Sequence, residues 1–474
     1  MAITRAALLL LIGALLTGLV PGASSAQGTS DAYLSFLMAR RLEAEGDNSG
    51  ALAALRRAAT ADPTSAEIRS EMAGFHLRHN ERNEAEAEAK AALALDSKNV
   101  GANRALGLIN AAAVEGSSGR DSAEQTATYL RDAIMYLERA VSVSPTTADV
   151  TLYYTLGRLY IRNDQATKAI EALSRVLSQN PDSVQGRLTM AQAYAANKDL
   201  KGAIATLQEV LEVEPRVAAA LGEYQAEAGL LTDAAESYTL ALAVQPRSRE
   251  LKLRRIAVLL DAKDYRSAAA FAAEARKQHP DDVRFVRLQA RALFDGGDRS
   301  GAIALLEQAT KDAPRDTGTL FTLADVYADA GRGPDAERVL RQIVAIEPTN
   351  ANALNYLGYL LAVRGEQLDE AITLVQRALE TEPENGAYLD SLGWAHFRKG
   401  NLNDAEKYLV AAAKQLPENS EIQDHLGDLF ARRGRLAEAI AAWTQALDGD
   451  GQDVDKAAIE KKISNAKGKM QNAK

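Results

Sequence analysis

Arg284, Arg287 and Arg291 form a closely spaced basic group in the second half of the chain. Their spacing of three and four residues places the three side chains on one stripe of an α-helix. Like charges at this spacing repel one another, so the stripe either faces water or awaits an anionic partner. The residues alone leave both interpretations open.

No catalytic or metal-binding constellation is evident among the other polar residues. His76 and His79 share a helix face, but the sequence offers no third metal ligand nearby. The sequence has no glycine-rich phosphate loop, no Gly-x-Ser-x-Gly elbow and no His-Glu-x-x-His pair. Zero cysteines exclude disulfides, thiolate zinc sites and thiol nucleophiles. The sequence therefore predicts a protein that is not an enzyme and has no catalytic residue, metal or cofactor.

Composition narrows the class further. The chain has 474 residues and a formal net charge of −9, which argues against a general grip on nucleic acid. Alanine and leucine are abundant, whereas aromatic residues make up 5% of the chain. This balance favours helix over strand.

Residues 1–26 have the pattern of a secretory signal. Arg5 precedes an apolar run of 15 residues, and the small residues Ser24 and Ala26 suit cleavage before Gln27. An uncleaved anchor is the alternative, but a helical span needs about 20 apolar residues. We therefore expect an exported protein, periplasmic or secreted, with no membrane span after cleavage.

From about residue 32 the chain repeats itself. Most intervals between its prolines are 34 residues, and an alanine lies twelve residues before each proline of this series. Extending the alanine series in both directions gives twelve units. The regularly spaced prolines are Pro181, Pro215, Pro246, Pro280, Pro314, Pro348, Pro383 and Pro417.

Each unit has the pattern of two helices. Apolar residues recur at three and four positions, as in Leu320, Leu323 and Tyr327, then a short turn intervenes and a second apolar stripe runs to the proline. Small residues at recurring positions predict a close contact between the two helices. Two units depart from the spacing: the sixth is shortened to 31 residues before Pro246, and 14 extra residues are expected to loop out around residues 116–121.

The fourth unit, with Tyr153, Leu156, Gly157, Tyr160 and Ala169, resembles the tetratricopeptide repeat family. The resemblance covers residues 32–451 and implies an all-α fold, an α-solenoid of about twelve helix-turn-helix repeats that forms a right-handed superhelix. Residues 452–474 are expected to form a capping helix at the end of the stack.

The resemblance also places the second, fifth, ninth and twelfth positions of each first helix on the concave side, where a protein or peptide would bind. In the later units these positions carry aromatic rings, carboxylates and an amide, which are suited to an apolar side chain beside a peptide backbone or a basic residue. Trp394 and Tyr359 are expected to be neighbours there. Packing between units is the alternative role. The candidate partner-binding residues are Arg284, Arg287, Arg291, Asn355, Tyr359, Asp390, Trp394, Phe397, Asp424 and Asp428, with Phe321 and Asp325 beside them.

The segment 355–443 is similar to exported bacterial tetratricopeptide proteins. This similarity implies a non-enzymatic scaffold or adaptor that binds proteins in the bacterial cell envelope. A more specific form is an adaptor for a periplasmic carboxy-terminal processing protease. The alternative from another class is a component of a polysaccharide secretion or assembly machine.

Overall fold

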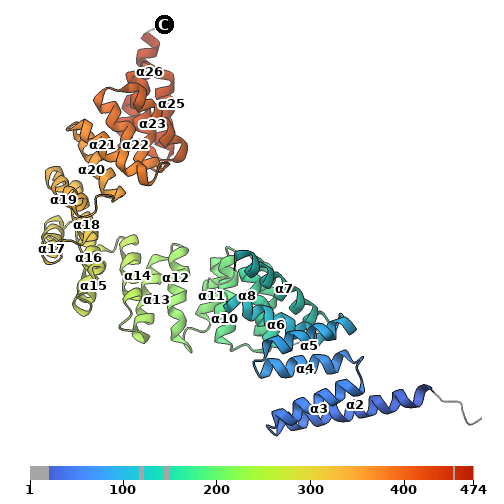
Figure 1. The fold of residues 1–474 in the computed structure, drawn as a ribbon. Coiled ribbons are helices and arrows are strands. Elements are labelled where there is room, and N and C mark those ends of the chain that lie inside the picture. The colour runs from blue at the N-terminus through green and yellow to red at the C-terminus, as the bar shows by residue number, and fades with distance from the viewer. Residues whose placement is uncertain (1–20, 117–121, 144–148, 452–453, 473–474) are drawn as a thin grey trace, which may run out of the picture. The chain divides into compact units, whose positions relative to one another are not determined.

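The computed structural model describes residues 21–116, 122–143, 149–451 and 454–472, and all regular secondary structure in these residues is helical. The chain forms two compact units, Met1–Gln245 and Pro246–Lys474 (Figure 1). Of the predicted signal, residues 1–26, the first 20 residues lie outside the described part of the chain. The first described helix begins at Pro21. None of the described helices combines the length and the hydropathy of a membrane span.

The N-terminal unit contains six helix pairs and one short 3₁₀ helix, η1 (Pro215–Val217). Its first helices are α2 (Pro21–Ala44), α4 (Ala66–Arg78), α6 (Val100–Gly116), α8 (Val150–Arg162), α10 (Val184–Ala196) and α12 (Ala218–Glu227). Its second helices are α3 (Asn48–Ala61), α5 (Arg82–Leu95), α7 (Ala123–Ser142), α9 (Ala166–Gln179), α11 (Leu200–Gln208) and α13 (Leu231–Val244).

The C-terminal unit contains six further pairs and a final single helix, α26 (Lys456–Asn472). Its first helices are α14 (Arg249–Asp261), α16 (Val283–Asp295), α18 (Thr317–Asp329), α20 (Ala351–Arg364), α22 (Gly386–Lys399) and α24 (Ser420–Arg432). Its second helices are α15 (Tyr265–Gln278), α17 (Arg299–Asp312), α19 (Gly333–Ile346), α21 (Leu368–Thr381), α23 (Leu402–Gln415) and α25 (Leu436–Asp448).

Each first helix packs against its own second helix and then the next pair follows, which confirms the predicted all-α fold of helix-turn-helix repeats. The twelve repeat alanines, from Ala51 to Ala439, are fully buried. The small residue in the first helix is also required by packing. A Cβ atom at Gly393 would lie 2.7 Å from Cγ of Leu409 and 2.9 Å from its backbone nitrogen. The two helices therefore approach as closely as the side chains permit.

The regularly spaced prolines have a physical explanation in the capping of helices. In eight repeats the residue two positions after the proline is a serine, aspartate or asparagine whose side chain accepts a hydrogen bond from the first turn of the next first helix. Proline stops one helix and the capping residue starts the next. These caps are Ser65, Ser183, Ser248, Asp282, Asp316, Asn350, Asn385 and Asn419.

The two irregular units differ from the pattern in different ways. The sixth is shortened as predicted: α12 has 10 residues, and η1 precedes it where a capped start is found in other repeats. The extra residues of the third unit do not simply loop out. Instead α6 has 17 residues and α7 has 20, whereas α4 and α5 have 13 and 14. The prediction of a loop was wrong for these residues because a capping box, Ser122 with Gln125, starts α7 early. Residues 117–121 lie outside the described part.

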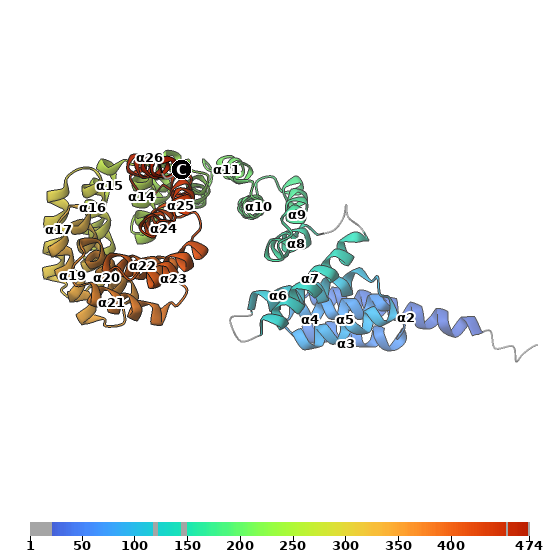
Figure 2. The same cartoon turned by 90° about the horizontal axis from the view of Figure 1, so that it is seen from above.

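Within the C-terminal unit the helix pairs follow a curve (Figure 2). The first helices α16, α20 and α22 lie on the inner side of this curve, and the second helices α17, α19, α21 and α23 lie on its outer side. The first helices of these pairs therefore lie toward the inside of the curve (Figure 2).

Candidate functional site

The faces of α14, α16 and α18 form a hollow of about 440 Å³ in the C-terminal unit, which we call the arginine pocket. All of its lining comes from first helices. It brings together the whole predicted arginine stripe, three apolar side chains and two neighbouring polar residues. The lining residues are Leu253, Arg284, Arg287, Leu288, Arg291, Phe321, Thr322 and Asp325.

Two of the three arginines are already paired with carboxylates. Arg284 forms an ion pair with Asp282, the capping residue of its own helix, with 2.7 Å between Nη2 and Oδ2. Arg291 contacts Asp295 at 2.8 Å, and it also reaches Asp325 and Asp329 on the next first helix at 3.3 and 3.8 Å. These carboxylates offset the repulsion that the spacing of the three arginines implies, and the choice between a solvated stripe and a partner site stays a prediction.

Arg287 differs from its two neighbours. Its side chain is half-buried, and within the described residues its guanidinium forms no ion pair or hydrogen bond. Nη1 lies over Gly318 in the first turn of α18, in space that a side chain at this position would occupy. Arg287 is thus the arginine of this pocket that has no carboxylate partner in the described residues, whereas Arg284 and Arg291 are both paired.

Asp325 is the one carboxylate among the lining residues of the arginine pocket, and Arg291 lies 3.3 Å from it. Burial raises the pKa of Asp325, and the charge of nearby Asp329 raises it further against the opposing effect of Arg291. The hydroxyl of Tyr356 donates a hydrogen bond to Asp325 Oδ1 over 3.4 Å, and the Tyr356 ring packs against Phe321 with 5.6 Å between centroids. The pocket therefore combines three guanidinium groups and one carboxylate with an apolar floor of leucine and phenylalanine side chains.

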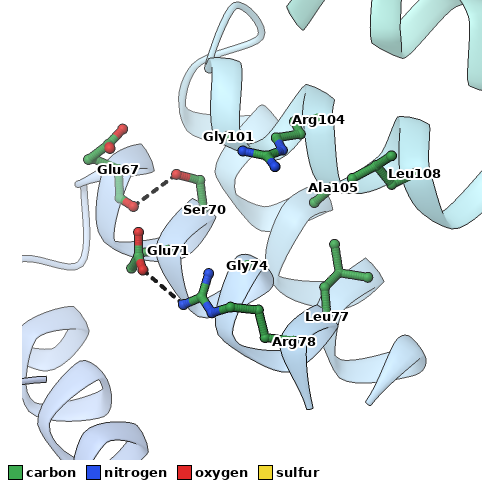
Figure 3. Close-up of a pocket in the computed structure, with 10 residues that line it drawn as sticks. All are labelled: Glu67, Ser70, Glu71, Gly74, Leu77, Arg78, Gly101, Arg104, Ala105 and Leu108. Atoms are coloured by element: carbon green, nitrogen blue, oxygen red, sulfur yellow. Dashed lines mark hydrogen bonds and ion pairs between the residues drawn. The ribbon is translucent and has the colours of Figure 1, made fainter. Parts of the chain in front are cut away.

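A second hollow of about 350 Å³ lies between α4 and α6 in the N-terminal unit (Figure 3). The sequence analysis did not single it out, although the same rule of second, fifth and ninth positions in a first helix points to it. The missed signal is the pair of glycines at such positions. Its lining residues are Glu67, Ser70, Glu71, Gly74, Leu77, Arg78, Gly101, Arg104, Ala105 and Leu108.

The charges of the second hollow are largely matched within the unit. Arg78 binds Glu43 at 2.7 Å and Glu71 at 3.1 Å, and Arg104 binds Asp149 at 2.9 Å. The guanidinium groups of the two arginines extend into the space between α4 and α6 from opposite helices (Figure 3). Its apolar floor and short side chains leave room for a further side chain from outside.

The predicted aromatic residues Trp394 and Phe397 stack on one another with 4.9 Å between ring centroids. The other ring contact of Trp394 is with His425 of the next first helix, at 3.9 Å. Asp390 is buried and lies 3.0 Å from Nδ1 of His425. These contacts join α22 to α24, and Trp394 and Phe397 stay half-buried, so a role in partner binding remains a prediction for them.

Burial and neighbouring carboxylates have opposite effects on the pKa of His425. Burial by itself would lower the pKa of His425, but the charge of Asp390 and the hydrogen bond to it, together with Glu421 and Asp424, raise this pKa above its ordinary value. Protonation of this ring, which stacks on Trp394, is therefore favoured relative to an ordinary histidine. The sequence analysis had placed His425 in no site.

The remaining predicted residues also contact other helices of the C-terminal unit. The Tyr359 hydroxyl hydrogen-bonds Glu421, which joins α20 to α24. Asp424 and Asp428 both bind Lys462 of α26, at 2.8 and 2.7 Å. Asn355 is half-buried, and its Oδ1 is buried without a hydrogen-bond partner in the described part of the chain. Asp424 and Asp428 of the last repeat are therefore already paired with a lysine of the same chain.

Comparisons with known proteins agree on one kind of repeat. Tetratricopeptide repeat models match residues 42–107, 130–186, 163–223, 256–319, 293–358 and 391–454. A tetratricopeptide-repeat-containing protein of Pseudomonas aeruginosa is 32% identical over 165 residues, which are 35% of this chain and 28% of that protein. This chain therefore spans less than a third of that relative's length.

Two solved structures have similar folds. Yeast Tom70 matches over 93% of this chain and 96% of its own, with 14% identity and a TM-score of 0.46. The Cut9–Hcn1 hetero-tetramer of the APC/C matches over 92% of this chain and 90% of its own, with 12% identity and a TM-score of 0.41.

Proposed function

Because the chain belongs to the tetratricopeptide repeat family, we propose that it is a non-enzymatic scaffold that binds segments of other proteins on the faces of its first helices. Repeats of this family serve protein–protein interaction. The repeats occupy nearly all of residues 32–451, so the part of the chain that the structure describes holds no second domain beside them.

The arginine pocket is the observation that carries this proposal. It combines an apolar floor with three arginines and one carboxylate, and all of its residues come from first helices. Recognition sites for protein segments use this combination, since apolar burial supplies affinity and a few polar groups supply specificity. The hollow between α4 and α6 offers a second site of the same construction in the other unit.

A role in the bacterial cell envelope is the finer form of the proposal. Its support is the signal-like segment, residues 1–26, and it includes the adaptor for a processing protease as its most specific version. A role in polysaccharide secretion remains the alternative. Cell fractionation with N-terminal sequencing tests the localisation: a mature chain that begins at Gln27 in the envelope fraction is expected, and an uncleaved cytoplasmic chain would refute it.

Site-specific photo-crosslinking tests the binding function itself. A benzophenone amino acid is placed at Leu288 or Leu108 on first helices, and at the exposed Val410 or Leu240 on second helices as controls. After irradiation in the native host, protein adducts are expected from the first-helix positions. Adducts from the control positions alone, or from none, would contradict the proposal.

A further inference from the structure

We propose that the arginine pocket recognises one acidic side chain that is flanked by an apolar residue, within a partner segment that passes through the pocket, and that Arg287 is the anchor. This inference rests on the proposed function and specifies the ligand of the same pocket. It differs from simple recognition of an acidic tract, because the charges around the three arginines are not equivalent.

The three arginines of the pocket differ in how many carboxylates already surround them. Arg284 and Arg291 together already contact four carboxylates, Asp282 and then Asp295, Asp325 and Asp329. An incoming carboxylate would have to compete with these groups. Only Arg287, among the three arginines of the stripe, has a guanidinium without such a partner in the described residues. One acidic side chain therefore matches the pocket, whereas a second one would meet Asp325 and Asp329.

The position of the Arg287 guanidinium depends on a glycine in the neighbouring first helix. The guanidinium of Arg287 can lie over the first turn of α18 because residue 318 is a glycine. A methyl group there would displace Nη1 without changing any charge. Gly318 is therefore a positioning residue for Arg287, and it provides a variant that separates the location of the charge from its presence.

Apolar side chains form the floor of the pocket beside Arg287. Leu253, Leu288 and Phe321 come from three successive first helices and line the pocket beside Arg287. Burying an aliphatic or aromatic side chain on such a surface favours binding because apolar area is removed from water. Because the floor continues from α14 to α18, we assign the carboxylate to an internal aspartate or glutamate rather than to a chain end.

Selection from a displayed library of random peptides tests this assignment. The peptides are presented with both ends blocked, so that only internal acidic side chains are available. The full chain is immobilised as wild type, as Arg287→Gln, as the matched control Arg266→Gln at an exposed position of α15, and as Thr322→Trp, in which a large ring fills the pocket. Wild type and Arg266→Gln are expected to enrich peptides with a single acidic residue next to an apolar one, and Arg287→Gln is expected to lose this preference.

Binding of one enriched peptide, measured by fluorescence anisotropy, completes the test. Arg287→Gln is expected to weaken binding by roughly tenfold or more, because a charge-assisted hydrogen bond is lost. Gly318→Ala is expected to weaken binding in the same direction with unchanged net charge, and a glutamine-for-glutamate peptide is expected to bind wild type as weakly as Arg287→Gln binds the original.

The outcomes that overturn the inference are distinct from those that overturn the proposed function. Enrichment of acidic tracts, a preference for free carboxyl ends in a second library, or an acidic preference that survives Arg287→Gln would refute the inference alone. Equal enrichment on wild type and on Thr322→Trp would show that the pocket binds no segment, and would contradict the proposed function as well.

Discussion

Glycines in the first helices serve two different purposes in this chain. Gly393 lies against Leu409 of its own second helix, where a Cβ atom would be too close to both the side chain and the backbone. Gly74 lines the hollow between α4 and α6, and the atom nearest to a Cβ there is the flexible end of Arg78 at 3.2 Å. The first glycine is required by packing, and the second leaves open space.

Replacing each of these glycines with alanine is expected to change stability in opposite directions. Gly74→Ala should stabilise its repeat by about 1 kcal/mol, because alanine is the better helix former. Gly393→Ala should destabilise its repeat by roughly 1–3 kcal/mol, because the added methyl group overpacks the contact with Leu409. Hydrogen exchange of the two repeats measures both effects, and stabilisation by both variants would contradict the packing account.

The Asp390–His425 pair makes the stability of the C-terminal unit depend on pH. The pKa of His425 is raised in the folded state, so its protonated form stabilises the fold. This stabilisation is fully present below the unfolded pKa of about 6.5 and is lost as the pH rises through the folded value. Asp390→Asn should therefore destabilise α22 and α24 on the order of 3 kcal/mol at low pH and less at high pH. A pH-independent difference from wild type would contradict this account.

The turn between the two helices of many repeats contains a residue in the left-handed backbone conformation. Glycine fills this position in many repeats, as at Gly331 and Gly434, but Lys198 and Lys263 adopt the same conformation with φ of 59° and 58°. A lysine in this region is strained by its Cβ atom. Each of these two turns is therefore less stable than the same turn would be with glycine at this position.

Lys263→Gly is expected to stabilise its repeat by roughly 0.5–1 kcal/mol through release of this strain. The matched control is Lys90→Gly, which removes a lysine from the interior of α5 and should destabilise by about 1 kcal/mol. Chemical denaturation followed by circular dichroism compares the variants. A loss of stability in Lys263→Gly equal to that of the control would show that the turn is not strained.

The elements were predictable from the sequence because helix starts, helix ends and close contacts each use a restricted set of residues. Proline followed by Ser, Asp or Asn two positions later defines the start of eight first helices, and the buried alanine defines the contact in all twelve repeats. The exceptions are local. The lengthened α6 and α7 could not be predicted from spacing, since an insertion of fixed length can extend helices or form a loop.

The candidate site was predictable only in part. The stripe of Arg284, Arg287 and Arg291 follows from helical periodicity, and the structure places it in one pocket. Its ion pairs with Asp325 and Asp329 depend on how adjacent repeats are rotated, which a single sequence does not specify. The same holds for Lys462, whose contacts with α24 come from the helix beyond the last repeat.

At the scale of the whole molecule, the last repeat is covered by α26. Ile459, Ile463 and Ala466 are buried in the same apolar cluster as Trp443, and Lys462 binds Asp424 and Asp428. The exposed end of the stack is thus closed by apolar contact and by one shared lysine. Burial raises the pKa of Asp428, and the charge of Asp424 adds to this effect, so both carboxylates depend on Lys462.

Lys462→Ala is expected to loosen α26, because two partly buried carboxylates then repel one another without a cation between them. Faster hydrogen exchange in α26 and in the adjoining face of α24 is the expected result. Lys461→Ala changes the exposed neighbour and should leave exchange unaffected. Equal exchange in all three proteins would show that apolar contact alone holds the helix.

The most direct test of the central claim is a hydrogen-exchange footprint of the full chain with and without the protein captured by photo-crosslinking. Binding on the first-helix face predicts protection in α14, α16 and α18 that is reduced by Arg287→Gln, while the second helices α15 and α17 exchange as in the free chain. Protection confined to the second helices would contradict the claim.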